Sequence, residues 1–168
     1  EHTAPIALDD YNATESLYRE GVFIGYRWFE QQQRKPLFSF GHGLSYSQFV
    51  ISDIELSSSL VKGDDSLIVT AKVKNISKRA GAEVVQLYLH DVESSVLRPN
   101  KELKGFAKVM LQPQETKLIK IRLTRRDLSF WDESKDEWLA EPGEFEVLLG
   151  NALDNISQRA TFWYDYNE

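Results

Sequence analysis

Two carboxylates beside an indole are the first residues of this sequence that could do chemistry. Trp131-Asp132-Glu133 places them next to a flat aromatic surface, and paired carboxylates can act as acid, base or nucleophile on a sugar ring. The tripeptide lies, however, between a strand-like stretch and residues 132–136, which have the composition of a hairpin tip. Asp and Glu are ordinary surface residues there. We therefore interpret it as part of a turn and predict no catalytic residue in this chain.

Histidines and acidic pairs are the next candidates, as metal ligands. His2, His42 and His90 are far apart and lack the spacing of a zinc site. The acidic pairs at 64–65 and 91–93 lack the glycine-punctuated ladder of a calcium loop. The sequence also contains no phosphate-cradling glycine loop and no Ser-His-Asp arrangement. It predicts no metal and no cofactor.

The composition is that of an acidic globular protein. Hydrophobic residues make up 42% of the 168 residues, and the formal net charge is −6. An acidic chain with scattered Lys and Arg does not attract polyphosphate, so we predict no nucleic-acid partner. No apolar run approaches the ~20 residues of a membrane-spanning helix, so we predict no membrane partner. The absence of cysteine excludes disulfides and thiol chemistry.

The elements that would position any site are predicted to be short strands. Apolar residues alternate with polar ones, most clearly at 67–73 and 145–149, which is the period of a half-buried strand. Gly105 is a candidate bulge within one of the strands. Turn signals recur every eight to twelve residues, and no stretch has a convincing helical period. This pattern predicts an antiparallel β-sandwich of seven or eight strands, over the following stretches: 51–56, 66–75, 82–91, 102–111, 116–123, 144–149 and 160–164.

A different composition marks Gly21–Phe49, which we call the joint segment. It is dense in glycine and aromatic residues, whereas a flexible linker would be rich in Ser, Gly and charge. At its start, the composition of residues 18–29, which overlap the joint segment, favours a strand. So many aromatics on an extension need a partner surface. We predict an interdomain joint in which Arg27 pairs with a carboxylate and His42 fills a packed loop. The predicted joint residues are Tyr26, Arg27, Trp28, Phe38, Phe40, His42 and Tyr46.

Several long motifs resemble family 3 glycoside hydrolases, the β-glucosidase group. YREGVFIGYRWFE and PLFSFGHGLSYSQF are similar to the segment that closes the second catalytic domain of that family. RAGAEVVQLYLHD, RPNKELKGFAKVML, RRDLSFWDE and EPGEFEVLLG are similar to its C-terminal fibronectin type III-like domain, in the expected order. The resemblance covers nearly the whole chain and weakens only before Tyr18. It implies that residues 1–48 belong to a preceding catalytic α/β domain and the joint, and that residues 49–168 form the sandwich.

The resemblance also implies a function. Family members are retaining exo-acting β-glycosidases, whose Asp nucleophile and Glu acid/base lie in the two preceding domains. Neither motif occurs in these 168 residues. We expect the chain to be the structural C-terminal part of such an enzyme, most simply a β-glucosidase acting on terminal non-reducing β-D-glucosyl residues in polysaccharide degradation. It would be inactive alone. Its expected partners are the barrel and α/β domains, in the same chain or as a separate cleaved one, and the carbohydrate substrate of the whole enzyme. The 98–106 region is expected to pack at the same joint.

One alternative remains open: a stand-alone carbohydrate-binding or adhesion sandwich. Four tryptophans could form a flat sugar-binding face, although tryptophans in strands belong more often to a core or a domain interface. They are Trp28, Trp131, Trp138 and Trp163.

The compartment is predicted from three N-x-Ser/Thr sequons, at Asn12, Asn75 and Asn155. They are candidate glycosylation sites of a secreted eukaryotic protein. The expectation is therefore a secreted or extracellular protein, or a periplasmic one in bacteria. A start at Glu1 rather than Met fits a processed chain or a piece of a larger one.

Overall fold

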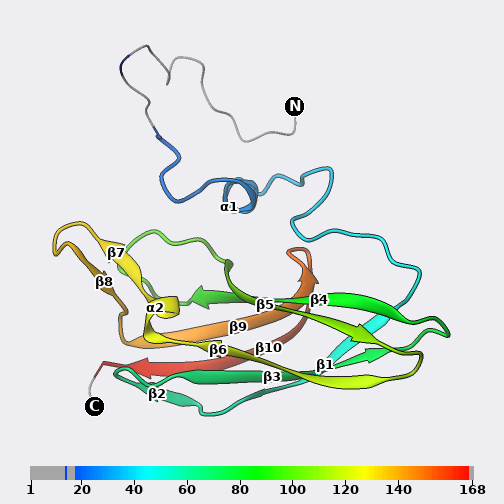
Figure 1. The fold of residues 1–168 in the computed structure, drawn as a ribbon. Helices are drawn as coiled ribbons and strands as arrows, with labels where there is room; N and C mark the ends of the chain where they lie inside the picture. Colours follow the sequence, from blue (N-terminus) through cyan, green and yellow to red (C-terminus); the bar gives the residue numbers. More distant parts are fainter. Residues whose placement is uncertain (1–13, 15–17, 167–168) are drawn as a thin grey trace.

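The structure is a computed structural model that describes Thr14 and residues 18–166 (Figure 1). Two β-sheets pack face to face, a small hairpin projects at one end, and the joint segment runs above the larger sheet. The predicted all-β sandwich is confirmed. Within the described residues, no helix has the length and apolar character needed to span a bilayer.

The smaller sheet has three antiparallel strands in the order β1-β3-β6. They are β1 (Phe49–Leu56), β3 (Leu67–Asn75) and β6 (Thr116–Leu123). The weak alternation of β1 has a structural cause. Its register with β3 slips by one residue between Ser52 and Glu55, and Asp53 there has a φ of 53°. One extra residue at a bulge switches the faces of the strand.

The larger sheet has five strands in the order β2-β10-β9-β4-β5. They are β2 (Leu60–Lys62), β10 (Asn155–Asp165), β9 (Gly143–Ala152), β4 (Gly81–Asp91) and β5 (Glu102–Leu111). The short β2 was not predicted, and it pairs parallel to β10, whereas the other ladders are antiparallel. The predicted bulge in β5 is present. Leu87 faces Gly105 and Tyr88 faces Leu103, which leaves Lys104 as the extra residue.

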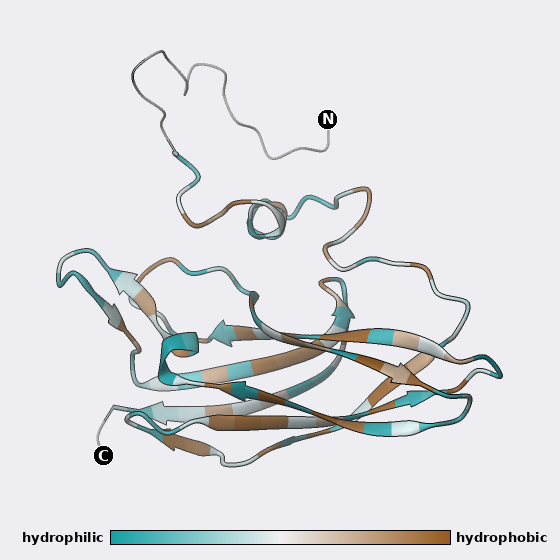
Figure 2. Ribbon diagram, viewed as in Figure 1, coloured by the Kyte–Doolittle hydropathy of each residue, from teal (hydrophilic) through white to brown (hydrophobic). Residues whose placement is uncertain are grey.

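The core lies between the two sheets and follows the predicted alternation. Apolar and polar segments succeed one another along the strands in Figure 2. The following residues, which were predicted to share one face of their strands, are all buried: Leu67, Val69, Ala71, Val73, Val85, Leu87, Leu89, Phe145, Val147 and Leu149. Burying this apolar face is the main force that holds the sheets together.

The hairpin at the end of the sandwich also follows the prediction. β7 (Phe130–Asp132) pairs with β8 (Glu137–Leu139), and Trp131 lies directly opposite Trp138. A short helix, α2 (Arg125–Leu128), leads into the hairpin.

The prediction of a strand at 18–29 is wrong. Turns occupy 19–22, and helix α1 spans Tyr26–Gln31. Gly21 and Gly25 both have a φ of 56°, a left-handed conformation that glycine adopts without steric cost. Two such bends within five residues prevent an extended strand, whatever the β propensity of the side chains between them.

Candidate domain joint

Helix α1 lies over the outer face of the larger sheet, the side away from the core (Figure 1). A second apolar cluster forms there, separate from the main core. Its buried residues are Tyr88, Leu148 and Leu153, and Tyr26 of α1 packs against them. The Tyr26 ring lies 6.1 Å from that of Tyr88 and 5.1 Å from that of Phe40. The joint segment therefore packs on the outer face of this sheet.

Polar contacts fix α1 to the start of β5. The backbone N–H of Leu103 donates a 3.0 Å hydrogen bond to the Tyr26 hydroxyl. The Arg27 guanidinium lies 4.0 Å from a carboxylate oxygen of Glu102, and Lys101 donates to the Glu30 carboxylate. Tyr26, Arg27 and Glu30 share one side of the helix because side chains three or four apart are neighbours. The carboxylate expected to pair with Arg27 is Glu102.

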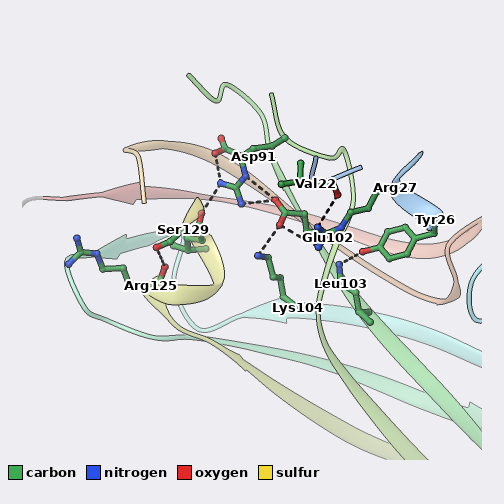
Figure 3. Close-up of polar contacts among 11 residues, drawn as sticks. Val22, Tyr26, Arg27, Asp91, Glu102, Leu103, Lys104, Arg125 and Ser129 are labelled. Carbon is green, nitrogen blue, oxygen red and sulfur yellow. Dashed lines mark hydrogen bonds and ion pairs between the residues drawn. The ribbon is translucent and has the colours of Figure 1, made fainter. Parts of the chain in front are cut away.

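Glu102 belongs to a larger group of charges that we call the charge network: Arg27, Asp91, Arg98, Glu102 and Lys104 (Figure 3). The Arg98 side chain is only 6% exposed. It donates to Asp91 at 2.9 Å, to Glu102 at 2.7–2.9 Å and to the Leu128 carbonyl at 2.8 Å. Lys104 lies 3.1 Å from Glu102. A buried guanidinium needs such partners, so this network ties the 98–104 region to both β4 and α2.

The environment sets the pKa of each charged group in the network. Burial raises the pKa of the Asp91 carboxyl, and the charge of Arg98 opposes this without reversing it. Burial alone would also raise the pKa of Glu102, but the charges of Lys104 and Arg98 outweigh it and hold the value below the ordinary one. Burial lowers the pKa of Lys104, and Glu102 offsets only part of that shift. Glu102 is therefore the stabilised anion of the network.

A second anchor holds the middle of the joint segment. The backbone N–H of Leu153 donates a 2.9 Å hydrogen bond to the Phe40 carbonyl. At the next residue, Gly41 has a φ of +85°, and a Cβ there would lie 2.0 Å from the Nε2 atom of Gln86. That amide is itself fixed, because it donates to the Asn151 carbonyl at 3.2 Å. Only glycine allows the chain to approach the sheet so closely at this position.

The predicted joint residues differ in how far their side chains are exposed. Tyr26, Arg27 and Trp28 are half-buried. Phe40 is 45% exposed although it packs on Tyr26. The others are exposed: Phe38 and His42, whose rings lie 5.1 Å apart, and Tyr46, which contacts Arg79. His42 was expected to fill a packed loop, but within this chain its side chain is exposed and contacts the ring of Phe38.

Other members of the joint were not predicted individually. Glu30 and Lys101 are 71 residues apart in the sequence, and their ion pair forms only once β5 lies beside α1. The 98–106 region had been expected at the joint, and this stretch holds Lys101, Glu102 and Leu103. The run of charges in RPNKELK was the available signal.

The remaining candidates lie apart from the joint. Trp131-Asp132-Glu133 runs from strand β7 into the tip of the β7–β8 hairpin, as predicted. The four tryptophans were expected in a core or interface, and none is buried. Trp131, Trp138 and Trp163 are 43%, 41% and 52% exposed. Among the described residues, no three His, Cys, Asp or Glu side chains gather in an arrangement that could hold a metal. His2 lies outside these residues.

The sequons have different environments. Asn75 is completely buried, and its side-chain amide donates to the carbonyls of Arg79 at 2.7 Å and Leu111 at 3.3 Å. A glycan has no room there, so the expectation of a glycosylation site at Asn75 is wrong. Asn155 is exposed at the start of β10. Asn12 lies outside the described residues.

The sequence is similar to a known domain family and to several β-glucosidases. Residues 83–152 match the fibronectin type III-like domain family. The chain is 46% identical over 139 residues to thermostable β-glucosidase B of Acetivibrio thermocellus, which covers 83% of this chain and 18% of that protein. It is 43% identical over 150 residues to probable β-glucosidase H of Aspergillus oryzae, with 89% and 18% covered.

The solved structures that resemble this chain are also β-glucosidases. A β-glucosidase of Kluyveromyces marxianus superposes with a TM-score of 0.83 at 39% identity and covers 92% of this chain and 18% of that one. A GH3 β-glucosidase of Bifidobacterium adolescentis superposes with a TM-score of 0.85 at 34% identity, with 94% and 23% covered. The chain thus spans about a fifth of the length of the relatives it matches.

Proposed function

Because the chain belongs to the fibronectin type III-like C-terminal portion of family 3 glycoside hydrolases, we propose that it holds together the catalytic domains of a β-glucosidase. One observation carries this proposal. The joint segment is anchored to the sandwich on one side and presents exposed apolar side chains on the other. Leu44 and Tyr46 are 96% and 91% exposed, and Leu37 and Phe38 are 72% and 66% exposed.

The energetics favour a partner that covers this surface. Burial of apolar area stabilises an interface by roughly 25 cal/mol per Å², and exposed apolar clusters of this kind mark interaction surfaces. The occupant that we propose is the catalytic part of the same enzyme, because the chain accounts for only about a fifth of its relatives. The charge network would keep the joint segment in position for that contact.

The activity of the whole enzyme is proposed from the relatives. All those described above are named β-glucosidases, which supports hydrolysis of terminal non-reducing β-D-glucosyl residues. Secretion and glycosylation are part of the proposal, and the exposed sequon at Asn155 supports them. For a bacterial source, the location that we propose is the periplasm.

A double substitution in the full-length enzyme tests the structural role. Phe38→Ala with Phe40→Ala is expected to lower both its thermal stability and its aryl β-glucosidase activity. The same pair in the 168-residue chain should have a much smaller effect on stability, because there it removes only the ring contacts of Phe40 with Tyr26 and of Phe38 with His42. The matched control is Val50→Ala with Leu118→Ala, two exposed apolar residues of the smaller sheet. Unchanged stability and activity in the full-length variant would refute the proposal.

A native mass measurement, made beside the aryl β-glucosidase assay, tests whether activity requires the catalytic domains. The 168-residue chain alone should be an inactive species of 19.4 kDa. Hydrolysis of an aryl β-glucoside by that species would contradict the proposed division of labour.

A further inference from the structure

A cleft of about 720 Å³ lies beside the charge network, between the joint segment, the 96–99 loop and the β7–β8 hairpin. Its volume falls within the ~300–1,000 Å³ range of small-molecule sites. Trp131 and Trp138 line one wall, on the same face of the hairpin, because they are a directly opposed cross-strand pair. We propose that this cleft binds a neutral sugar, with a pyranose ring stacked on Trp131.

The aromatic wall supplies the stacking surface. The two indole rings lie 5.5 Å apart in an edge-to-face arrangement. The Arg126 guanidinium lies 3.4 Å from the ring centroid of Trp138, so it covers one face of that indole and holds it in place. Trp131 remains 43% exposed. A rigid indole beside an open cleft can pack against the C–H face of a pyranose ring, and its N–H can still reach a polar partner.

The polar wall supplies hydrogen bonds. Arg27 and Lys104 line the cleft, and each carries more donors than its contacts with the chain use. Arg27 donates to the Val22 carbonyl, lies 4.0 Å from Glu102 and is 5.9 Å from the centroid of the Tyr26 ring, and Lys104 pairs with Glu102. Glu133, on the hairpin side, adds an exposed carboxylate as an acceptor. Donors and acceptors around one aromatic plate match the hydroxyls of a sugar ring.

The charge balance of the cleft argues for a neutral ligand. Three lining residues are cationic and three are anionic, which gives a formal charge of zero: Arg27, Arg98, Lys104, Glu102, Asp132 and Glu133. Arg27, Arg98 and Lys104 each form an ion pair with Glu102. These pairs leave little positive potential in the cleft to attract a phosphate or a carboxylate. A neutral hexose unit has the required combination of an apolar face and hydroxyl groups.

Titration of the 168-residue chain with cellotetraose, followed by tryptophan fluorescence and by NMR, tests the site. We expect a saturable change that Trp131→Ala weakens about fivefold, which corresponds to a loss of about 1 kcal/mol in binding free energy. Trp163→Ala is the matched control, since Trp163 is 52% exposed on β10 and does not line the cleft. It should bind like the parent chain.

A second variant keeps the test decisive if Trp131→Ala disturbs the hairpin. Leu97 lines the cleft and is 72% exposed, so Leu97→Lys should fold normally and still block the sugar. Absence of saturable binding by the parent chain would overturn the proposal, as would equal binding by the Leu97→Lys chain. So would the finding that these variants weaken only the association with separately produced catalytic domains, because the cleft would then be a protein interface. Sugar binding by the chain alone needs no catalytic domain, so this result and the Phe38/Phe40 test can fail independently.

Discussion

Arg98 is the central cation of the charge network, and its contacts explain why the loop before β5 is ordered. Its guanidinium reaches two carboxylates and the Leu128 carbonyl at once. A lysine ammonium cannot reproduce this planar, forked geometry. Removal of the cation would leave two largely buried carboxylates without their main partner, which is costly in a low-dielectric environment.

Replacement of Arg98 should therefore destabilise the sandwich itself. Arg98→Met is expected to lower the free energy of unfolding of the 168-residue chain by about 3 kcal/mol, measured by chemical denaturation. Arg122→Met is the control, because Arg122 is exposed on β6, and it should change stability by less than about 0.5 kcal/mol. Equal effects of the two substitutions would show that the network contributes nothing to stability.

Glu102 makes stability depend on pH in the acid range. Its folded-state pKa lies below the ordinary value of 4.5, so its contribution is fully present above that value and is lost as the pH falls through the folded pKa. Glu102→Gln should thus be less stable than the parent chain at pH 7, and the difference should shrink as the pH falls below about 4.5. Denaturation curves at a series of pH values measure this.

The matched control for that profile is Glu133→Gln, at the exposed tip of the hairpin. Its unfolding free energy should follow the parent chain at every pH. A Glu102→Gln chain that stays destabilised by a constant amount down to pH 2 would mean that packing, and not charge, makes residue 102 important.

At the scale of elements, the β9–β10 hairpin shows how closely the backbones approach one another. A Cβ at Gly150 would lie 2.2 Å from the Asn155 carbonyl oxygen, in the paired strand. The register between the two strands also shifts beside Asn155 and Ile156. The absence of a side chain at Gly150 is therefore a condition for this pairing.

Gly150→Ala should consequently destabilise the chain strongly, by about 2–3 kcal/mol, because backbone must move to make room. Thermal unfolding of the 168-residue chain would measure the loss. Gly43→Ala is the control, since a Cβ there meets nothing within 4 Å. A Gly150→Ala chain as stable as this control would show that the hairpin adjusts freely.

Helix α1 shows how context overrides composition at this scale. Its aromatic residues Tyr26, Trp28 and Phe29 favour strands, yet the glycine bends before it and its contacts with β5 select a helix. Propensity is a weak preference that tertiary contacts readily exceed. The docked helix is short and has no buried residue of its own, so its position depends on the ion pairs and on the stacking of Tyr26.

At the scale of the whole molecule, the sandwich and the joint segment form a module with two kinds of surface. The smaller sheet turns a mostly polar outer face to solvent, whereas the joint segment presents the exposed apolar residues proposed to contact catalytic domains. A module of this kind would contribute stability and geometry to an enzyme rather than reacting groups.

Glycosylation tests which of the sequon asparagines are accessible in the folded chain. After expression through a eukaryotic secretory route, mass spectrometry should find a glycan on Asn155 and none on Asn75, because Asn75 is completely buried with its amide bonded to two carbonyls. Asn155→Gln should then remove the mass shift. A glycan on Asn75 of the folded, secreted chain would contradict the burial of this residue at the end of β3.

The sequence by itself determined most of the strands, the contents of the core and a bulge in β5 beside Gly105. Side-chain alternation is a local property, and at 67–73 and 145–149 it requires one face to be buried, whichever strand lies beside it. The motifs likewise indicated the resemblance to family 3 glycoside hydrolases, because long motifs in a fixed order need no knowledge of contacts.

Only the tertiary structure decided which residues meet. The strand order places β5 beside α1, and this brings Lys101 to Glu30 and Glu102 to Arg27 across more than seventy residues. It also buries Asn75, whose sequon looks like the other two in the sequence, and gathers Trp131, Trp138 and Arg27 around one cleft. Such contacts depend on sheet register and on backbone bends at glycine, and no local pattern of side chains encodes these relations.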